Sequence, residues 1–180
     1  MGNETELIKG CRAGDNSARK KLYTLYSNKM LAVCYRYVGD KDVAHDVLHD
    51  GFIKIFTHFS FRGESSLATW ITRIMVMQAI DYLRKQQRIN RIVSYEDEYP
   101  DIPDTEGCNQ LSEEQLMEFV AELPTGCRTI FNLYVFEGKS HKEIADMLHI
   151  KEHSSTSQLH RAKYLLTKRI KEYMDYEERK

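Results

Sequence analysis

The sequence has no run of eighteen apolar residues, no closely spaced cysteine pair and no stretch of alternating β-branched residues. The missing apolar run excludes a transmembrane helix. The four cysteines, Cys11, Cys34, Cys108 and Cys127, include no C-x-x-C pair. We therefore expect free thiols in a reducing cytoplasm rather than disulfides or a zinc knuckle. Because the strand pattern is missing as well, we expect an all-α fold.

Targeting signals and common enzyme motifs are also missing. The first ten residues lack the basic start and apolar run of a signal peptide. Glu6 stands where a myristoylation motif requires Ser or Thr. There is no Gly-rich phosphate loop, nucleophile elbow or pair of catalytic carboxylates. These absences predict a cytoplasmic protein that is not an enzyme and uses no cofactor.

The formal net charge of −1 hides an uneven distribution. Residues 1–91 hold 15 Lys and Arg against 9 Asp and Glu, residues 92–127 hold 10 acids and no Lys or Arg, and residues 128–180 hold 11 basic against 8 acidic residues. Each basic end can attract phosphate, because the local field matters more than the total charge. We expect two small helical domains, 1–91 and 112–180, joined by an acidic flexible linker at 92–111.

Apolar spacing and end signals predict a series of helices before residue 138. Ser112 and Gln115 form a capping box, and Pro124 suits the first turn of a helix that stops before Gly138. The helices are expected at residues 15–38, 41–59, 67–88, 112–122 and 124–137.

Residues 138–173 predict a helix-turn-helix. Ser140 and Glu143 form a second capping box before a short apolar stripe, and a break follows at residues 149–152. The second helix of such a motif can enter a DNA major groove. An ordinary helical hairpin with a solvated basic face is the alternative. The polar residues expected to point outward on the second helix are Ser157, Gln158, Arg161 and Lys168.

The helix expected at residues 67–88 begins with an aromatic residue and ends with a basic cluster. An aromatic ring beside a row of cations suits single-stranded DNA, because bases stack on the ring while the backbone follows the charges. Taken singly, Trp70 also suits a protein core, and the cations also suit the helix dipole. The residues sharing one face are Trp70, Arg73, Met77, Asp81, Arg84 and Arg88.

These patterns resemble the bacterial extracytoplasmic-function sigma factors, which are two-domain specificity subunits of RNA polymerase. The resemblance extends from Leu22 to Ile170, apart from the linker. In the first domain it rests on Ala44, Asp46, residues 50–54, Trp70, Ile71 and residues 79–85. In the second it rests on Leu123, Pro124, Arg128, Phe131, Leu133, Tyr134, Glu137, Gly138 and residues 143–145 and 159–163.

The resemblance implies a role for each segment. The helix of residues 42–57 would dock on the clamp coiled coil of the largest polymerase subunit, through Asp46, Asp50, Phe52 and Lys54. The loop of residues 60–66 and the next helix would open the −10 element and hold a flipped base, through Arg62, Gly63, Glu64, Trp70, Arg73, Met77, Arg84, Lys85 and Arg88. The helix from Ser154 would read the −35 duplex, through Ser154, Thr156, Ser157, Gln158 and Arg161. An anti-sigma factor is implied as a further partner.

The chain also departs from the family pattern. Val43, His45 and His49 replace acidic and amide residues that are usual in the docking helix, and Met77 replaces an Asn. His153 stands for a Gly at the start of the recognition helix, and Thr156 for a basic residue. Fewer fixed charges there predict weaker phosphate attraction at the −35 element.

Two other functions compete with this interpretation. The histidine pairs His45/His49 and His149/His153 have the i, i+4 spacing at which two imidazoles can share a metal ion. Asp46 and Asp50 lie near the first pair. However, there is no H-E-x-x-H motif, and the second pair straddles the expected turn. A helix-turn-helix regulator that never binds polymerase would need the C-terminal motif but not the pattern of the first domain.

Overall fold

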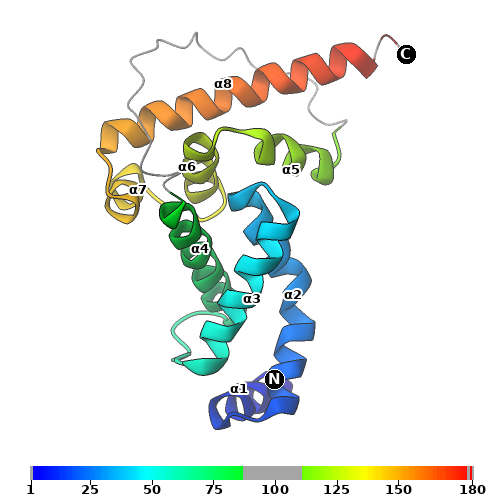
Figure 1. The fold of residues 1–180 in the computed structure, drawn as a ribbon, viewed down its shortest axis with the longest axis vertical. Coiled ribbons are helices and arrows are strands. Elements are labelled where there is room, and N and C mark those ends of the chain that lie inside the picture. Colours follow the sequence, from blue (N-terminus) through cyan, green and yellow to red (C-terminus); the bar gives the residue numbers. More distant parts are fainter. Residues whose placement is uncertain (1, 87–110, 178, 180) are drawn as a thin grey trace. The chain divides into compact units, whose positions relative to one another are not determined.

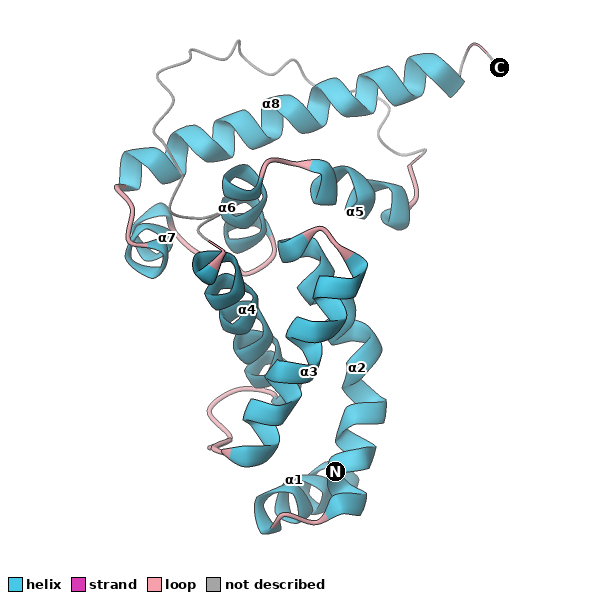
Figure 2. Ribbon diagram, in the orientation of Figure 1, coloured by secondary structure: helices cyan, strands magenta, loops and turns pink. Residues whose placement is uncertain are grey.

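The protein is described by a computed structural model that covers residues 2–86, 111–177 and 179. The described residues are helical with connecting turns and contain no strand (Figures 1 and 2). The expected all-α fold is thereby confirmed. The chain divides into two compact units, Met1–Tyr82 and Leu83–Lys180. Arg88 and residues 92–110 of the predicted linker lie outside the described residues.

In the first unit, α2 (Asn16–Val38) and α3 (Lys41–Thr57) pack side by side (Figure 1). The side chain of Asp15 accepts hydrogen bonds from the first backbone N–H groups of α2, and Asp40 does the same for Val43 of α3. Gly39 ends α2 with a φ of 71°, a left-handed conformation that a glycine adopts without steric cost. These caps set a turn of two residues between the helices.

The core of the first unit is completed by α4 (Leu67–Lys85). Its inner face contributes several fully buried apolar side chains, among them Ile71, Met75 and Ile80. Gly51 of α3 lies against Met75, because a Cβ atom at Gly51 would lie 2.4 Å from the sulfur of Met75. The glycine in the Asp50-Gly51-Phe52 sequence therefore makes room for α4.

The helix α1 (Gly2–Ala13) is a feature that the sequence analysis missed. Leu7 and Cys11 are buried, one turn apart on the face that packs against α2. The two helices approach closely, since a Cβ atom at Gly10 would lie 2.6 Å from that of Ala18. The i, i+4 pair of apolar residues was the available signal, but it is short and no capping residue precedes it.

The second unit contains α5 (Glu113–Glu122), α6 (Thr125–Val135), α7 (His141–Leu148) and α8 (Glu152–Glu177). Both predicted capping boxes are present, Ser112 with Gln115 and Ser140 with Glu143. His149 ends α7 in the left-handed region, with a φ of 56°. The short connection from α7 to α8 confirms the helix-turn-helix.

A buried arginine ties α5 to α6. The side chain of Arg128 is 6% exposed and donates to the backbone carbonyls of Ala121 and Leu123, at the end of α5. Carbonyls at a helix end have no partner within the helix. The guanidinium therefore closes the end of α5, which gives a structural reason for an arginine at this position.

Candidate nucleic-acid interface

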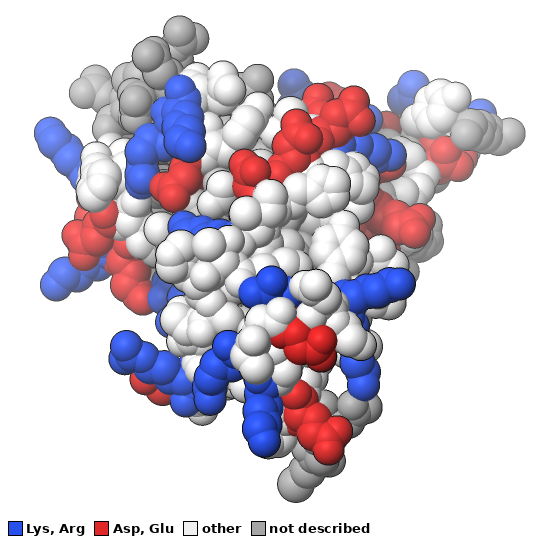
Figure 3. All heavy atoms as spheres, turned by 60° about the horizontal axis from the view of Figure 1, so that its bottom comes forward, with Lys and Arg blue, Asp and Glu red and all other residues white. Residues whose placement is uncertain are grey.

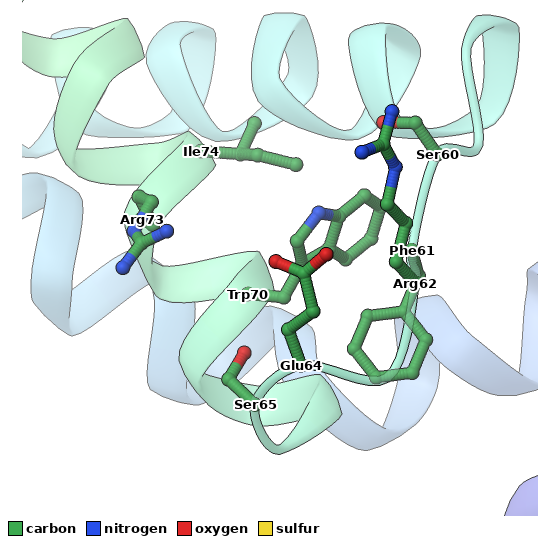
Figure 4. A pocket seen from close by; sticks show the side chains of 8 residues that line it. All are labelled: Ser60, Phe61, Arg62, Glu64, Ser65, Trp70, Arg73 and Ile74. Carbon is green, nitrogen blue, oxygen red and sulfur yellow. The ribbon is translucent and has the colours of Figure 1, made fainter.

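A pocket of about 450 Å³ lies between the loop after α3 and the first turns of α4. Its size falls in the range of small-ligand sites. Figure 4 shows the Trp70 ring in the middle of the group, with Glu64 in front of it and Arg73 one turn further along α4. The lining residues are Ser60, Phe61, Arg62, Glu64, Ser65, Trp70, Arg73 and Ile74. The structure thus brings together four residues predicted for the −10 interface, Arg62, Glu64, Trp70 and Arg73.

Two phenylalanines hold the tryptophan at the pocket. The ring of Trp70 meets that of Phe59 edge to face at 5.2 Å and that of Phe61 at 5.5 Å between centroids. Trp70 is half-buried, so it is partly a core residue and partly a wall of the pocket. Such a ring, fixed in place and still accessible, is suited to stacking against a flat π system.

The polar groups around the ring differ in sign. Arg62 and Arg73 are exposed and supply cations, and Glu64 supplies a carboxylate acceptor. A ligand with a flat ring, a hydrogen-bond donor and a nearby phosphate would satisfy all three. A nucleotide in an unstacked strand has these groups.

The remaining residues predicted for this interface are spread along the chain. Gly63 adopts a φ of 81° at the tip of the loop. Met77 is half-buried on α4, and Arg84 and Lys85 occupy the last turn of that helix. None of these four lines the pocket. Arg88 lies outside the described residues.

The exposed face of α3 contains three of the four residues predicted to dock on polymerase, Asp46, Asp50 and Lys54. The fourth, Phe52, does not lie on this exposed face. Its side chain is 2% exposed and packs against Tyr23 at 4.8 Å and Phe56 at 5.6 Å between ring centroids. The docking role predicted for Phe52 came from the family resemblance, which does not separate a core aromatic from a surface one.

Other residues share that face of α3 and were not chosen from the sequence. Ile53 is 62% exposed, which is unusual for an isoleucine, and His45 and His49 are exposed with ring centroids 6.5 Å apart. Ile53 adds an apolar side chain to the charged residues of this face. In the described part of the chain, no cluster of three or more His, Cys, Asp or Glu side chains could hold a metal ion.

At the first turns of α8, the residues that face outward are not all those predicted from the sequence. Gln158 was expected to point outward, but its side chain is 3% exposed and accepts a hydrogen bond from Cys127 of α6 at 2.9 Å. Ser154 is 4% exposed. Both were predicted to contact DNA, and their side chains instead lie in the interior of the second unit. The apolar contacts of Leu159 and Ala162 rotate the helix so that Gln158 faces α6.

The accessible face of α8 includes the other three residues predicted for the −35 interface. Thr156 is exposed, and Ser157 and Arg161 are half-buried. The hydroxyl of Thr156 donates to the carbonyl of Glu152 at 3.3 Å, and that of Ser157 donates to the carbonyl of His153 at 3.0 Å. His153, His160 and Lys163 complete this face, with the histidine at 160 half-buried.

The beginning of α8 is fixed by contacts to neighbouring helices. Nδ1 of His141 lies 2.9 Å from the hydroxyl of Ser155, and the imidazole of His141 stacks on Tyr134 at 4.9 Å between centroids. The Ser155 side chain is fully buried. The first turn of α8 therefore rests on a fixed support, which suits a helix predicted to read DNA.

Charge is mixed on one face of the molecule. Figure 3 shows Lys and Arg side chains interspersed with Asp and Glu on the face that it displays, rather than one broad patch of a single sign. A face of this kind favours short-range contacts over long-range steering.

The described cysteines are buried thiols. Cys11, Cys34 and Cys127 are free. Burial raises the pKa of Cys34 to about 12 and that of Cys127 to about 11. These thiols stay protonated and unreactive at neutral pH.

Within residues 2–86 and 111–177, no helix is apolar over a length sufficient to cross a bilayer.

Comparison with known proteins agrees with this geometry. The profile of Sigma-70 region 2 matches residues 22–89, and that of Sigma-70 region 4 matches residues 113–166. Together they cover the loop pocket, the exposed face of α3 and the helix-turn-helix.

Similar proteins match over nearly the whole chain. The ECF RNA polymerase sigma-E factor of Haemophilus influenzae is 30% identical over 93% of this chain and 95% of its own length. The RNA polymerase sigma-H factor of Pseudomonas aeruginosa is 28% identical over 93% of each chain. The ECF RNA polymerase sigma factor SigW of Bacillus subtilis is 25% identical over 92% of this chain and 95% of its own length.

A solved structure has the same fold. The sigma factor RpoE of Bartonella quintana, crystallised with the anti-sigma factor NepR, superposes with a TM-score of 0.51 at 19% identity, over 84% of this chain and 96% of its own. The resemblance inferred from the sequence is confirmed by these matches. The chain belongs to the extracytoplasmic-function sigma factors of bacterial RNA polymerase.

Proposed function

We propose that the pocket around Trp70 holds an unstacked base of the −10 element during promoter opening. The observation that supports this most strongly is the position of Trp70, clamped by Phe59 and Phe61 yet open to a pocket of about 450 Å³. Stacking on such a ring contributes roughly 1–3 kcal/mol per base. This stabilisation is available only to a base that has left the duplex, so it favours strand opening.

The polar residues of the pocket complete the site. Glu64 accepts a hydrogen bond from the base edge, while Arg62 and Arg73 bind the flanking phosphates. Arg84, Lys85 and Arg88 extend the path of the backbone along the C-terminal part of the same helix. The residues at the pocket act on single-stranded DNA, because a base stacked within a duplex cannot enter a pocket in the protein.

The second unit reads the −35 element as duplex. The accessible face of α8, with Thr156, Ser157, His160 and Arg161, enters the major groove. Arg161 supplies the strongest contact, since a guanidinium can bind a guanine edge through two hydrogen bonds. Ser154 and Gln158 support the helix from the interior and do not touch DNA.

Docking on core polymerase uses the exposed face of α3. Asp46, Asp50 and Lys54 provide charge complementarity, and Ile53 provides an apolar anchor at the centre of the contact. Phe52 holds α3 against α2 and acts on docking only through the fold. Residues 1–91 thus form the −10 and docking domain, residues 92–111 the linker, and residues 112–180 the −35 domain.

The protein acts as a regulatory subunit. Sigma factors give polymerase its promoter specificity, and catalysis of RNA synthesis belongs to the core enzyme. This chain has no catalytic role of its own, works in the cytoplasm where polymerase and promoters are, and uses no cofactor. Because the similar protein of Bartonella quintana was crystallised with an anti-sigma factor, an inhibitory partner of that kind is proposed for this chain too.

Permanganate footprinting tests the division between the two units. Holoenzymes with Trp70→Ala should bind a closed promoter normally but leave the −10 thymines unreactive to permanganate. A pre-melted template should restore only part of the lost promoter opening. Holoenzymes with Arg161→Ala should bind the duplex promoter weakly and perform normally on a pre-melted template. If both variants fail at the same step, the proposed assignment is incorrect.

A further inference from the structure

The helix α1 has no part in the function proposed above, and it precedes the residues matched by the Sigma-70 region 2 profile, which start at residue 22. It is nevertheless firmly attached to the first unit. Leu7 and Cys11 are buried against α2, and Gly10 allows the two helix backbones to approach closely. Because α1 is held rigidly, a segment that binds one of its side chains is held in place as well.

Arg12, in the last turn of α1, binds the pocket loop. Its Nη2 atom donates a hydrogen bond of 2.9 Å to the backbone carbonyl of Phe61, which is 49 residues away in sequence. The donor is charged, and such hydrogen bonds are stronger than those between neutral groups. The bond fixes the loop at the residue that contacts Trp70.

A second arginine holds the point where α3 leads into the loop. Nη2 of Arg19 donates to the carbonyl of Phe56 at 3.0 Å, and its guanidinium carbon lies 5.9 Å from the centre of the Phe56 ring. This carbonyl is in the last turn of α3, where no backbone N–H of the helix remains to bind it. The loop that follows is therefore tied at its start by α2 and further along by α1.

The contact continues from the loop to the pocket. The ring of Phe61 is 8% exposed and meets Trp70 edge to face at 5.5 Å between centroids, with an interplanar angle of 61°. Fixing the Phe61 backbone therefore fixes the ring that holds Trp70. A loop without this bond would have to lose its conformational freedom when DNA binds, which weakens binding.

We infer that Arg12 is a positioning residue for the −10 pocket: through Phe61 it orders Trp70 before DNA arrives, and it does not itself contact DNA. This inference rests on the proposed role of the pocket. It assigns α1 a function as a brace for the loop and predicts that α1 affects −10 opening without affecting −35 reading or docking.

The single tryptophan of the chain provides a direct readout. In the free, full-length protein, Arg12→Ala should increase the quenching of Trp70 fluorescence by acrylamide, because a loosened Phe61 exposes the indole. In the holoenzyme, the same variant should weaken binding of a single-stranded −10 oligonucleotide by roughly three- to tenfold, the range expected for one such hydrogen bond. Binding to a −35 duplex and to core polymerase should not change.

Lys9→Ala is the matched control, since Lys9 is an exposed cation on the same helix. Like Arg12→Ala, it removes one positive charge. It should change neither Trp70 quenching nor −10 affinity. The salt dependence separates the two roles further. Loss of a phosphate contact lowers the slope of log K against log salt by about one, whereas loss of a positioning contact leaves that slope unchanged, as expected for Arg12→Ala.

Gly10→Ala tests the brace with every charge retained, because the added methyl group would collide with Ala18 and displace α1. It should raise Trp70 quenching as Arg12→Ala does. The inference is overturned if Arg12→Ala leaves Trp70 quenching unchanged, or if it lowers the salt slope as a phosphate contact would. If instead Trp70→Ala binds the −10 strand normally, the proposed function of the pocket fails, and that result is distinguishable from a failure of the brace.

Discussion

The Sγ atom of Cys127 on α6 donates a hydrogen bond of 2.9 Å to Oε1 of Gln158 on α8. Both side chains are buried, with exposures of 0% and 3%. The bond joins α8 to the core of its own domain and keeps the Gln158 amide in the interior. In the proposed function, the residues that read the −35 element are therefore those on the accessible face, with Thr156 and Ser157 at its start.

Gln158→Ala should destabilise the second unit rather than alter base preference. Removing a buried hydrogen-bonding group costs about 1–3 kcal/mol, so the free energy of unfolding measured with denaturant should fall by that amount. Thr156→Ala, on the accessible face, should leave stability within about 0.5 kcal/mol of wild type. A change in the preferred −35 sequence with unchanged stability of the Gln158 variant would contradict the buried assignment.

Arg161→Ala should weaken −35 duplex binding by about 1–3 kcal/mol, the range for one bidentate base contact. Fluorescence anisotropy with the full-length protein and a −35 duplex measures this. Lys168→Ala is the control, because Lys168 is an exposed cation further along α8 that pairs with Glu172 at 4.0 Å. An equal loss in both variants would mean that α8 contributes only non-specific charge.

Asp50→Lys should reduce co-purification with core polymerase and leave the melting temperature unchanged, since Asp50 is exposed on α3. Glu6→Lys makes the same charge change on the exposed side of α1 and should not affect docking.

Phe52→Ala should lower the free energy of unfolding by about 3–5 kcal/mol, as expected for a buried aromatic side chain. A stable Phe52→Ala protein that no longer binds polymerase would restore Phe52 to the docking surface.

Much of this fold could be predicted from local signals. Ser112 with Gln115 and Ser140 with Glu143 are capping boxes in the structure as in the sequence. Capping depends on neighbours in sequence, so its outcome can be read without tertiary information. The same holds for Gly39, which ends α2.

The orientation of side chains could be predicted only in part. Phe52 and Gln158 are each one position away from a more accessible residue, the exposed Ile53 and the half-buried Ser157 respectively. A rotation of the helix by one residue would exchange buried and accessible positions. Which orientation wins depends on partners distant in sequence, such as Tyr23 for Phe52 and Cys127 for Gln158. The bond from Arg12 to Phe61 has no sequence signature, because it joins a side chain to a backbone carbonyl in another segment.

The capping box of α7 should make the stability of the protein depend on pH in the acid range. Hydrogen bonds from Lys139 and from the backbone and side chain of Ser140 lower the pKa of Glu143 to about 2, from an ordinary value of 4.5. The folded state therefore favours the carboxylate, and its stabilisation is present above pH 4.5 and is lost as the pH falls toward 2. The carboxylate is exposed, so solvent screening keeps the effect small and salt-sensitive.

Glu143→Gln isolates this effect, because glutamine also suits a capping box but does not titrate. The difference in melting temperature between wild type and Glu143→Gln should shrink as the pH falls from 5 to 2 at low salt. Lys139→Ala removes the main donor, found 2.8 Å from the carboxylate, and should flatten the same pH dependence. A difference that stays constant over this pH range would show that Glu143 does not titrate as described.

The central claim is that Trp70 stacks on an unpaired base of the −10 element, and a double-mutant cycle tests it most directly. The affinity of the holoenzyme for a single-stranded −10 oligonucleotide would be measured with wild type and Trp70→Ala, each with the intact strand and with an abasic site at successive positions. If ring and base interact, the two losses are not additive at one position, with a coupling free energy of about 1–3 kcal/mol. Additive losses at every position would contradict the account.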